Sequence, residues 1–225
     1  MLDREKDYVA AKVMDMLMST HPRLHESFKR LRNLIEGKAV LIVGAGSNCR
    51  LVSDLHRYYE QVIAADGAYY CCREVGIIPG IIVTDLDGVS LKDLRRFEGI
   101  SVIHAHGDNI DKVVWWVPLL KNSSVVGTVQ TFPPSPQVNV FGGFTDGDRA
   151  AYLAYFFRPR RIGLVGFDFS GEVGKYSKLG YGKVRGSLLR RKMEKLNWAS
   201  RLLTRLIVEG DVDVQCHSCK GFGRF

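Results

Sequence analysis

Short apolar segments alternate with amphipathic segments between residues 39 and 167, and this alternation constrains the fold more than any other feature of the sequence. Segments that are apolar throughout are typical of strands buried on both faces. When such strands alternate with helices, the usual result is a parallel sheet covered by helices on both sides. We therefore expect an α/β protein with a Rossmann-like, largely parallel sheet. The expected strands are 39–44, 62–65, 80–84, 101–105, 125–129, 137–141 and 161–167, with helices near 48–59, 68–75, 90–97, 109–121 and 147–157.

Helical patterns also precede and follow this region. Residues 3–19 and 23–36 are expected to form two helices, so that 1–36 is an N-terminal helical appendage and 37–225 is the α/β catalytic domain. A long helix is expected near 187–209, followed by an edge strand at the sequence DVDVQC. The intervening residues 171–186 carry five glycines and four basic residues, which favours a mobile loop.

Length and composition exclude several classes of protein. The chain of 225 residues is long enough for one substantial core. It has no run of about 18 apolar residues, so we expect no membrane span, and its charged N-terminus lacks the apolar stretch of a secretory signal. Five cysteines, an odd number scattered along the chain, predict reduced thiols in a cytoplasmic protein rather than a disulfide framework.

The formal net charge of +8 is unevenly distributed. Residues 39–157 carry 9 basic and 12 acidic side chains, which gives −3, whereas residues 158–225 carry 15 basic and 6 acidic side chains, which gives +9. The basic part can face a polyanionic small substrate, bind nucleic acid, or form the charged surface that is typical of thermophilic proteins. We favour the small substrate, and nucleic acid is not the expected partner.

Aspartates recur where the expected strands end. The motifs are ADGA, TDLDG, HGDN, TDGD and GFDFS, and their aspartates include Asp66, Asp85, Asp87, Asp108 and Asp146. Ligands of α/β proteins bind at the carboxyl ends of parallel strands, and carboxylate oxygens suit Mg²⁺, which usually accompanies phosphates. Asp85 and Asp87 project to the same side if strand geometry persists, so that they can share Mg²⁺. The alternative is a capping turn before the next helix.

Three further motifs carry weaker signals. The turn VGAGSN, with Gly44, Gly46 and Ser47, can either cradle a phosphate with its amides or serve as a tight turn between strand and helix. The pair His104 and His106 is expected to pack or form hydrogen bonds rather than bind a transition metal. The sequence CHSC at 216–219 has the spacing of half a zinc site, but no second half is evident.

Taken together, ADGA, TDLDG, HAHGDN and GGFTDGDRA resemble the archaeal 6-hydroxymethyl-7,8-dihydropterin pyrophosphokinases, and GFDFS…GKYSKL fits the same family. The resemblance covers roughly residues 38–206. That family is similar in turn to thiamin pyrophosphokinases, whose corresponding turns are ADGG, GDxDS and GGRxDH. Here Phe144 and Gly147 replace the arginine and histidine of the last turn, so the contacts of those two side chains do not carry over.

The resemblance implies transfer of diphosphate from ATP to the hydroxymethyl group of a reduced pterin, with release of AMP, in the synthesis of folate-like or methanopterin cofactors. Together with the carboxylates it assigns Asp85 and Asp87 as primary Mg²⁺ ligands and Asp66 and Asp146 as supporting ligands. Lys175 and Lys178 are expected to pair with phosphate oxygens when their loop closes. The residues expected to contact the nucleotide or substrate are Gly44, Gly46, Ser47, Asp66, Gly67, Asp108 and Asn109.

Two other classes of function remain open. A glycosyltransferase could use Asp85 and Asp87 to bind the diphosphate of a nucleotide sugar through the same metal. A non-catalytic nucleotide- or RNA-binding protein could use the basic C-terminal part. The sequence leaves the acceptor alcohol, the general base and the oligomeric state undetermined, and a homodimer is one open possibility.

Overall fold

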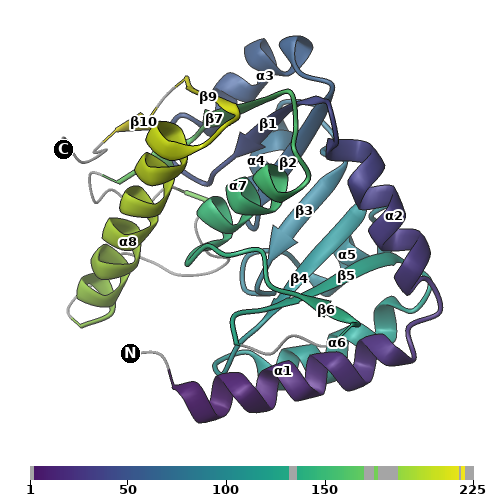
Figure 1. The fold of residues 1–225 in the computed structure, drawn as a ribbon. Helices are drawn as coiled ribbons and strands as arrows, with labels where there is room; N and C mark the ends of the chain where they lie inside the picture. The colour runs from purple at the N-terminus through teal and green to yellow at the C-terminus, as the bar shows by residue number, and fades with distance from the viewer. Residues whose placement is uncertain (1–2, 132–135, 170–174, 177–186, 218, 221–225) are drawn as a thin grey trace.

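The computed structural model describes residues 3–131, 136–169, 175–176, 187–217 and 219–220, and everything said below about the structure concerns these residues. The chain folds around one eight-stranded sheet in the order β6-β5-β4-β3-β2-β1-β7-β9, and every neighbouring pair is parallel (Figure 1). The strands are β1 Ala39–Val43, β2 Gln61–Ala65, β3 Ile81–Thr84, β4 Ile100–Ala105, β5 Ser124–Val129, β6 Val138–Asn139, β7 Arg161–Val165 and β9 Asp213–Cys216.

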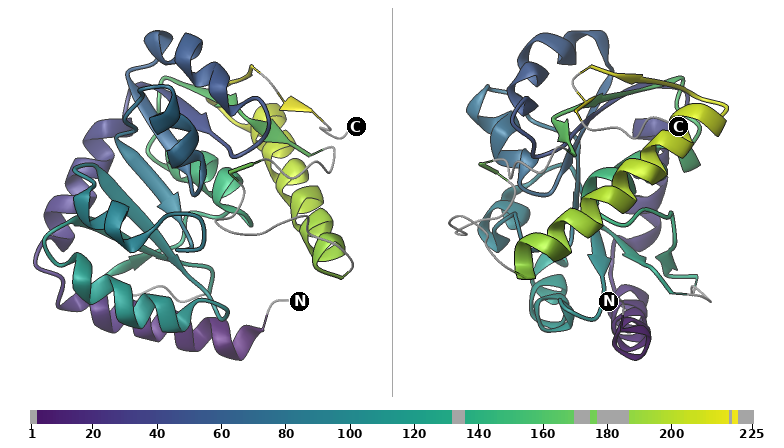
Figure 2. Two further views of the ribbon diagram at one scale, coloured as in Figure 1. Left: turned by 180° about the vertical axis from the view of Figure 1, so that it is seen from behind. Right: turned by 90° about the vertical axis from the view of Figure 1, so that its left-hand side faces the viewer.

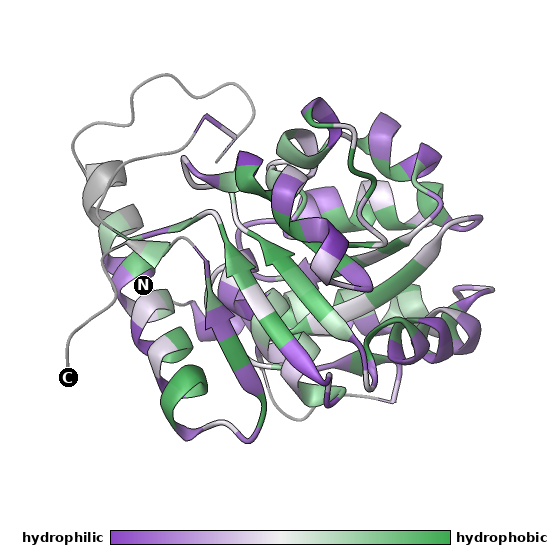
Figure 3. Cartoon of the chain, turned by 90° about the horizontal axis from the view of Figure 1, so that it is seen from above, coloured by the Kyte–Doolittle hydropathy of each residue, from purple (hydrophilic) through white to green (hydrophobic). Residues whose placement is uncertain are grey.

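Helices cover both faces of this sheet, and alternate residues of each strand point to one face or the other. Leu41 and Val43 of β1 face the core that contains α1, α3, α4, α5 and α6, whereas Val40 and Ile42 face the core that contains α2, α7 and α8. Figure 2 shows these two layers from behind and from the side, and Figure 3 shows how apolar the central strands are. The helices are α1 Arg4–Ser19, α2 Leu24–Ile35, α3 Val52–Leu55, α4 Ala68–Glu74, α5 Leu91–Arg96, α6 Ile110–Trp116, α7 Asp146–Phe156 and α8 Ser187–Glu209.

The prediction of a Rossmann-like α/β fold is confirmed, and the sheet is parallel throughout. Three elements differ from the sequence prediction for local reasons. The strand expected at 161–167 is interrupted by Gly166, whose positive φ of 73° turns the chain into the separate short strand β8 (Phe167–Asp168), which pairs with β10 (Cys219–Lys220). The helix expected near 48–59 divides into α3 and two 3₁₀ turns, Cys49–Leu51 and His56–Tyr58. The helix expected near 109–121 changes to a 3₁₀ turn at Val117–Leu120, where Pro118 lies near the start.

The two N-terminal helices pack on opposite faces of β5. Met14 and Met18 of α1 belong to one core, and Leu31 and Ile35 of α2 belong to the other. Gly127 of β5 allows this approach, because a Cβ there would lie 2.9 Å from the Met18 side chain. The two helices thus complete the layers at this end of the sheet. The division into a helical segment, 1–36, and a catalytic domain, 37–225, stays a prediction.

The C-terminal part completes the other end of the sheet. Helix α8 packs on α7 through Ala199, Leu203 and Leu206, and β9 forms the edge strand beside β7, as the sequence predicts. Among the described residues, no helix is both long enough and apolar enough to cross a membrane. Most of the expected mobile loop at 171–186 lies outside the described residues.

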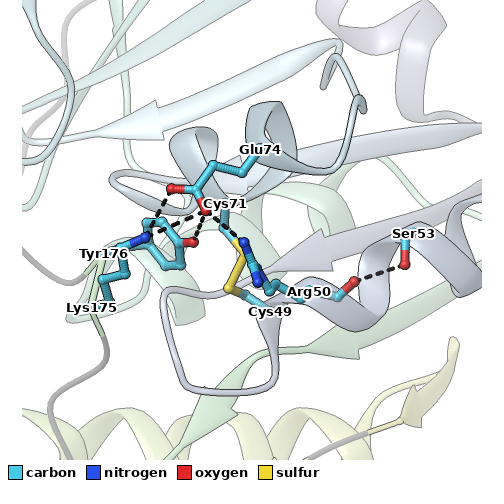
Figure 4. The surroundings of a disulfide bond; sticks show 7 residues. All are labelled: Cys49, Arg50, Ser53, Cys71, Glu74, Lys175 and Tyr176. Atoms are coloured by element: carbon cyan, nitrogen blue, oxygen red, sulfur yellow. Dashed lines mark hydrogen bonds and ion pairs between the residues drawn. A yellow bond between two sulfur atoms is a disulfide. The ribbon is translucent and has the colours of Figure 1, made fainter.

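The prediction of reduced thiols is wrong for Cys49 and Cys71, which are joined in a disulfide, whereas Cys72 is a buried free thiol. The Cys49–Cys71 bond links the turn after β1 to helix α4, with 6.4 Å between the two Cα atoms (Figure 4). Because these cysteines are 22 residues apart and on different elements, only the fold brings them together.

We predict that reducing the Cys49–Cys71 bond lowers the free energy of unfolding by about 3 kcal/mol. The reason is that the bond joins residues 22 positions apart and closes a loop in the unfolded chain. Urea unfolding of the wild-type protein should shift to lower denaturant concentration when dithiothreitol is added. The Cys49→Ser/Cys71→Ser double variant should unfold near the midpoint of the reduced wild type and respond little to dithiothreitol. Equal midpoints for the oxidised wild type and the double variant would contradict the prediction.

Candidate functional site

Three carboxylates meet where β2 and β3 end. Asp66 follows β2, and Asp85 and Asp87 follow β3, which pairs with β2 in parallel register so that Ala65 lies opposite Val83. One oxygen atom from each of the three side chains lies within 4.8 Å of the other two. These are three of the four residues that the sequence predicts as metal ligands, and the parallel pairing of β2 and β3 is what places them side by side.

Asp66 is held by its neighbours on β3 rather than by its own strand. Its carboxylate accepts a hydrogen bond of 2.7 Å from the Thr84 hydroxyl and one of 3.0 Å from the Gly88 amide. Gly88 must be a glycine for this contact, because a Cβ at that position would lie 1.8 Å from Asp66 Oδ2. Asp66 itself has a positive φ of 48°, a conformation that aspartate adopts more readily than most residues.

Asp85 and Asp87 lie together in the structure, but the geometry differs from the one that the sequence argument assumes. Strand geometry does not persist beyond Thr84, since Leu86 has a positive φ of 70°. The Leu86 amide donates a hydrogen bond of 2.8 Å to the Thr84 hydroxyl, and the Asp87 amide donates one of 3.3 Å to Asp85 Oδ1. A tight turn, rather than strand alternation, therefore brings both carboxylates to Asp66. Thr84 and Gly88 are positioning residues that the sequence analysis missed, although they are the first and last residues of the motif TDLDG.

Asp146, the fourth predicted ligand, lies at the start of α7 beside this cluster. Burial raises the pKa of its carboxyl group well above the usual value, and the charges of Asp85 and Asp66 add to the effect. The residue as a whole is only half-buried, but its Oδ1 atom is shielded from solvent and has no hydrogen-bond partner among the described residues. A buried carboxylate oxygen without a donor is unusual and indicates a ligand that the described residues do not supply.

Asp148, two residues further on, has a structural role instead. Its buried carboxylate accepts hydrogen bonds from the amides of Phe144 and Thr145, at 2.6 Å and 2.7 Å, and from the Thr145 hydroxyl at 2.5 Å. These contacts fix the start of α7 and thereby the position of Asp146. The next residue, Arg149, is 4 % exposed, and the sequence analysis did not single it out. Its signal was its spacing of three residues from Asp146, which puts both side chains on one side of the helix.

The HAHGDN segment after β4 supports Asp85 from the other side. His106 Nε2 lies 3.4 Å from Asp85 Oδ2. The Asn109 amide group donates to the carbonyl oxygens of Asp85 and His104, at 2.7 Å and 2.8 Å, and accepts from the His106 amide. Asn109 therefore ties the loop after β4 to the loop after β3. Asp108 is exposed and contributes no oxygen atom to the cluster of Asp66, Asp85 and Asp87.

The glycine turn after β1 packs against the chain rather than leaving its amides free. The Gly44 amide donates to the Val165 carbonyl oxygen, and the Gly46 amide donates to the Gly166 carbonyl oxygen, both at 2.8 Å. A Cβ at Gly44 or Gly46 would lie 2.6 Å or 2.5 Å from that same Gly166 oxygen. The tight-turn interpretation therefore accounts for both glycines. Ser47 donates a long hydrogen bond of 3.4 Å to Asp168.

Lys175 lies near the site but is paired with an acidic side chain. Its ammonium group is 3.1 Å from the Glu74 carboxylate, which also accepts from Arg50 at 2.9 Å and from the Tyr176 hydroxyl (Figure 4). These contacts, led by the Tyr176 hydrogen bond, lower the pKa of Glu74 to about 2. Gly67 lies directly under this segment, because a Cβ there would be 1.9 Å from the Tyr176 carbonyl oxygen. Lys178 lies outside the described residues.

The donor set fits a hard divalent cation. All three clustered side chains offer carboxylate oxygens, and Asp146 adds an oxygen atom without a partner at the same edge of the sheet. Mg²⁺ prefers oxygen ligands and is usually held by a few carboxylates together with the phosphates of a substrate. An acidic cluster of this kind at the carboxyl edge of a parallel sheet is typical of α/β proteins that bind phosphorylated ligands.

The comparisons with known proteins identify the family. The model of the family described as 6-hydroxymethylpterin diphosphokinase MptE-like matches residues 15–173. Curated relatives at 36–42 % identity carry the name 6-hydroxymethyl-7,8-dihydropterin pyrophosphokinase. The protein from Methanocaldococcus jannaschii is 37 % identical over 91 % of this chain and 88 % of its own length. The protein from Pyrococcus furiosus is 42 % identical over 88 % of this chain and 84 % of its own length. The chain therefore belongs to the 6-hydroxymethylpterin diphosphokinase family.

One solved structure has a related outline. The MAf glycosyltransferase from Magnetospirillum magneticum AMB-1 matches 94 % of this chain and 38 % of its own chain, with 14 % identity and a TM-score of 0.46. A similarity this low carries no argument about function.

We predict that the metal-free protein loses stability as the pH rises from about 4 to about 8. Burial, together with the charges of Asp85 and Asp87, raises the pKa of Asp66 to about 8. Between the unfolded-state pKa near 4 and this folded-state pKa, the folded protein binds a proton that the unfolded chain has released, so the free energy of unfolding falls with pH. Thermal unfolding in EDTA across this pH range measures the effect.

The Asp66→Asn variant should show a shallower decline than the wild type, since its amide oxygen can accept the Thr84 and Gly88 hydrogen bonds without titrating. The exposed Asp111→Asn variant is the control and should follow the wild type. Addition of Mg²⁺ at pH 7.5 should raise the melting temperature and release protons. An unchanged slope in Asp66→Asn would contradict the assignment of the raised pKa to this residue.

Proposed function

We propose that this chain is a 6-hydroxymethyl-7,8-dihydropterin diphosphokinase that uses ATP and a divalent cation. The observation that supports this most strongly is the convergence of Asp66, Asp85 and Asp87 at one edge of the sheet, in a chain whose relatives are named for that activity. The reaction joins the pterin hydroxymethyl oxygen to the β-phosphorus of ATP. The bond from that phosphorus to the oxygen bridging the α- and β-phosphates breaks, AMP leaves, and the alcohol proton passes to solvent.

The four carboxylates divide into two groups by their surroundings. Asp85 and Asp87 lie on the turn after β3 with partly exposed side chains, so they are the proposed primary cation ligands. Asp66 is buried and anchored by Thr84 and Gly88, and Asp146 has the oxygen without a partner, so both are proposed as supporting ligands. When bound, the cation neutralises phosphate charge and aligns the attacking and leaving oxygens.

Other side chains fix the geometry of this site. Asn109 holds the loops after β3 and β4 together, and His106 packs beside Asp85. Lys175 is proposed to exchange its partner Glu74 for a phosphate oxygen when the substrate binds, because its ammonium group is exposed and lies on the segment that crosses Gly67. The proposed role of Lys178 in phosphate binding depends on residues outside the described part of the chain. We place the activity in the cytoplasm, with ATP and a reduced pterin as its ligands.

We predict that the reaction yields AMP and a pterin diphosphate in equal amounts. Anion-exchange chromatography of a mixture of protein, ATP, Mg²⁺ and 6-hydroxymethyl-7,8-dihydropterin measures both products. ADP as the main nucleotide product would indicate transfer of a single phosphate and contradict the proposal. Turnover of a nucleotide sugar in place of ATP would favour the glycosyltransferase alternative.

We predict that Asp85→Asn and Asp87→Asn each lower kcat/KM on the order of 10² to 10⁴-fold, because each removes a charged ligand from the proposed cation. Both side chains are partly exposed at a turn, so the melting temperature should change little. Asp111→Asn, at the start of α6, removes the same charge outside the site and should retain wild-type activity. A loss of stability that parallels the loss of activity would mean that the two aspartates serve as structural caps.

A further inference from the structure

Arg149 is a buried cation whose partner the described residues do not supply. Its side chain lies on the first turn of α7, and the residue is 4 % exposed. Within 4.0 Å of its guanidinium group the described part of the chain provides no carboxylate oxygen. The one hydrogen bond that it makes to the described residues is long, 3.4 Å from Nη2 to the Gly143 carbonyl oxygen. A guanidinium group has five N–H donors, and a charge removed from water is costly unless it is paired.

The nearest acidic residue along the chain does not account for this arginine. The Asp148 carboxylate is already satisfied by the amides of Phe144 and Thr145 and by the Thr145 hydroxyl. It fixes the helix start whether or not Arg149 carries a charge. The remaining acceptor within one helical turn is Asp146, whose Oδ1 atom has no hydrogen-bond partner among the described residues. Among the described residues, Arg149 thus has only the long hydrogen bond to Gly143, and the Asp146 Oδ1 atom, three residues earlier in the chain, has none.

Arg149 lies among the groups of the acidic site. Burial lowers the pKa of its guanidinium group, and the charges of Asp146, Asp148 and Asp85 act in the opposite direction. Burial lowers the pKa of His104, which stacks beside His106, and the charge of Arg149 lowers it further. Gly143 lies in close contact with Arg149, because a Cβ at Gly143 would lie 2.4 Å from the Arg149 Cα atom. The turn before α7 therefore packs directly against the backbone of Arg149.

We propose that Arg149 binds the polyphosphate of the nucleotide, next to the cation held by the aspartates. This inference rests on the proposed function. A triphosphate brings several negative charges to an edge of the sheet that already carries four carboxylates, and a divalent cation offsets only part of that charge. The planar guanidinium group can donate two parallel hydrogen bonds to one phosphate, which makes arginine well suited to this role. Phosphate oxygens would provide the acceptors that the described chain does not.

The test measures binding of inorganic tripolyphosphate with Mg²⁺ by isothermal titration calorimetry, together with melting temperature. Arg149→Met keeps the aliphatic bulk and removes the charge, and its affinity should fall roughly 10- to 100-fold, the range expected for lost charged hydrogen bonds. Arg149→Lys keeps the charge but loses the paired geometry, and it should bind less tightly than the wild type but more tightly than Arg149→Met. Arg161→Met is the control, because Arg161 is the first residue of β7 and lies at the amino-terminal end of the strand, away from the acidic site. It should bind tripolyphosphate as the wild type does.

The melting temperature separates binding from a structural role. Without ligand, Arg149→Met should melt no lower than the wild type, because an unpaired buried charge has been replaced by an apolar group. With tripolyphosphate and Mg²⁺, it should gain less stability than the wild type. Unchanged tripolyphosphate affinity in both Arg149 variants would overturn the inference, and so would a lower melting temperature in the ligand-free Arg149→Met together with wild-type affinity in Arg149→Lys.

These measurements need no turnover, so they are independent of the proposed reaction. If the wild type binds tripolyphosphate through Arg149 but forms no AMP with a reduced pterin, the inference stands and the proposed function fails. If AMP forms at the wild-type rate in both variants, the proposed function stands and the inference fails.

Discussion

Three carboxylates whose oxygen atoms lie within 4.8 Å of one another repel, and the rest of the site depends on how the protein holds them there. The turn after β3 provides the main restraint. Its Thr84 hydroxyl and Gly88 amide donate to Asp66, while the left-handed residue Leu86 turns the chain so that Asp85 and Asp87 face back toward it. Part of the repulsion is relieved by protonation, since Asp66 has a pKa of about 8 in the absence of a cation. A divalent cation would replace that proton.

Two charged groups beside the three carboxylates are buried. The Asp146 carboxyl group and the Arg149 guanidinium group are both withdrawn from water, and neither has a full set of partners among the described residues. In a medium of low polarity such groups interact strongly with an ion that arrives beside them. A cation suits Asp146 and a phosphate suits Arg149, and a polyphosphate with its metal ion brings both at once. The same geometry therefore supports the proposed function and the further inference.

The differences between expectation and structure occur where contacts between distant parts of the chain decide the outcome. The sequence leaves Gly44 and Gly46 as either a phosphate cradle or a tight turn, and their amides donate to Val165 and Gly166, more than 100 residues away in the sequence. Asn109 is predicted from the sequence to contact the ligand, and in the structure its amide group connects the loops after β3 and β4. Nothing in the sequence relates Cys49 to Cys71, and they form a disulfide because the turn after β1 packs beside α4. In each case the partner lies on another element, and a local pattern carries no information about it.

The sequence by itself determined the α/β class, the parallel sheet, most strand positions and the identity of the acidic residues. It could do so because burial of strands on both faces imposes a local apolar pattern, and because aspartate and glycine at strand ends are local signals as well. Only the tertiary structure decided which carboxylates meet. Asp66 and Asp85 are brought together by the pairing of β2 with β3, Asp108 stays outside, and Asp146 arrives with α7 from beyond β6. The strand order and the left-handed turn at Leu86 set these distances, and both depend on packing between residues far apart in the chain.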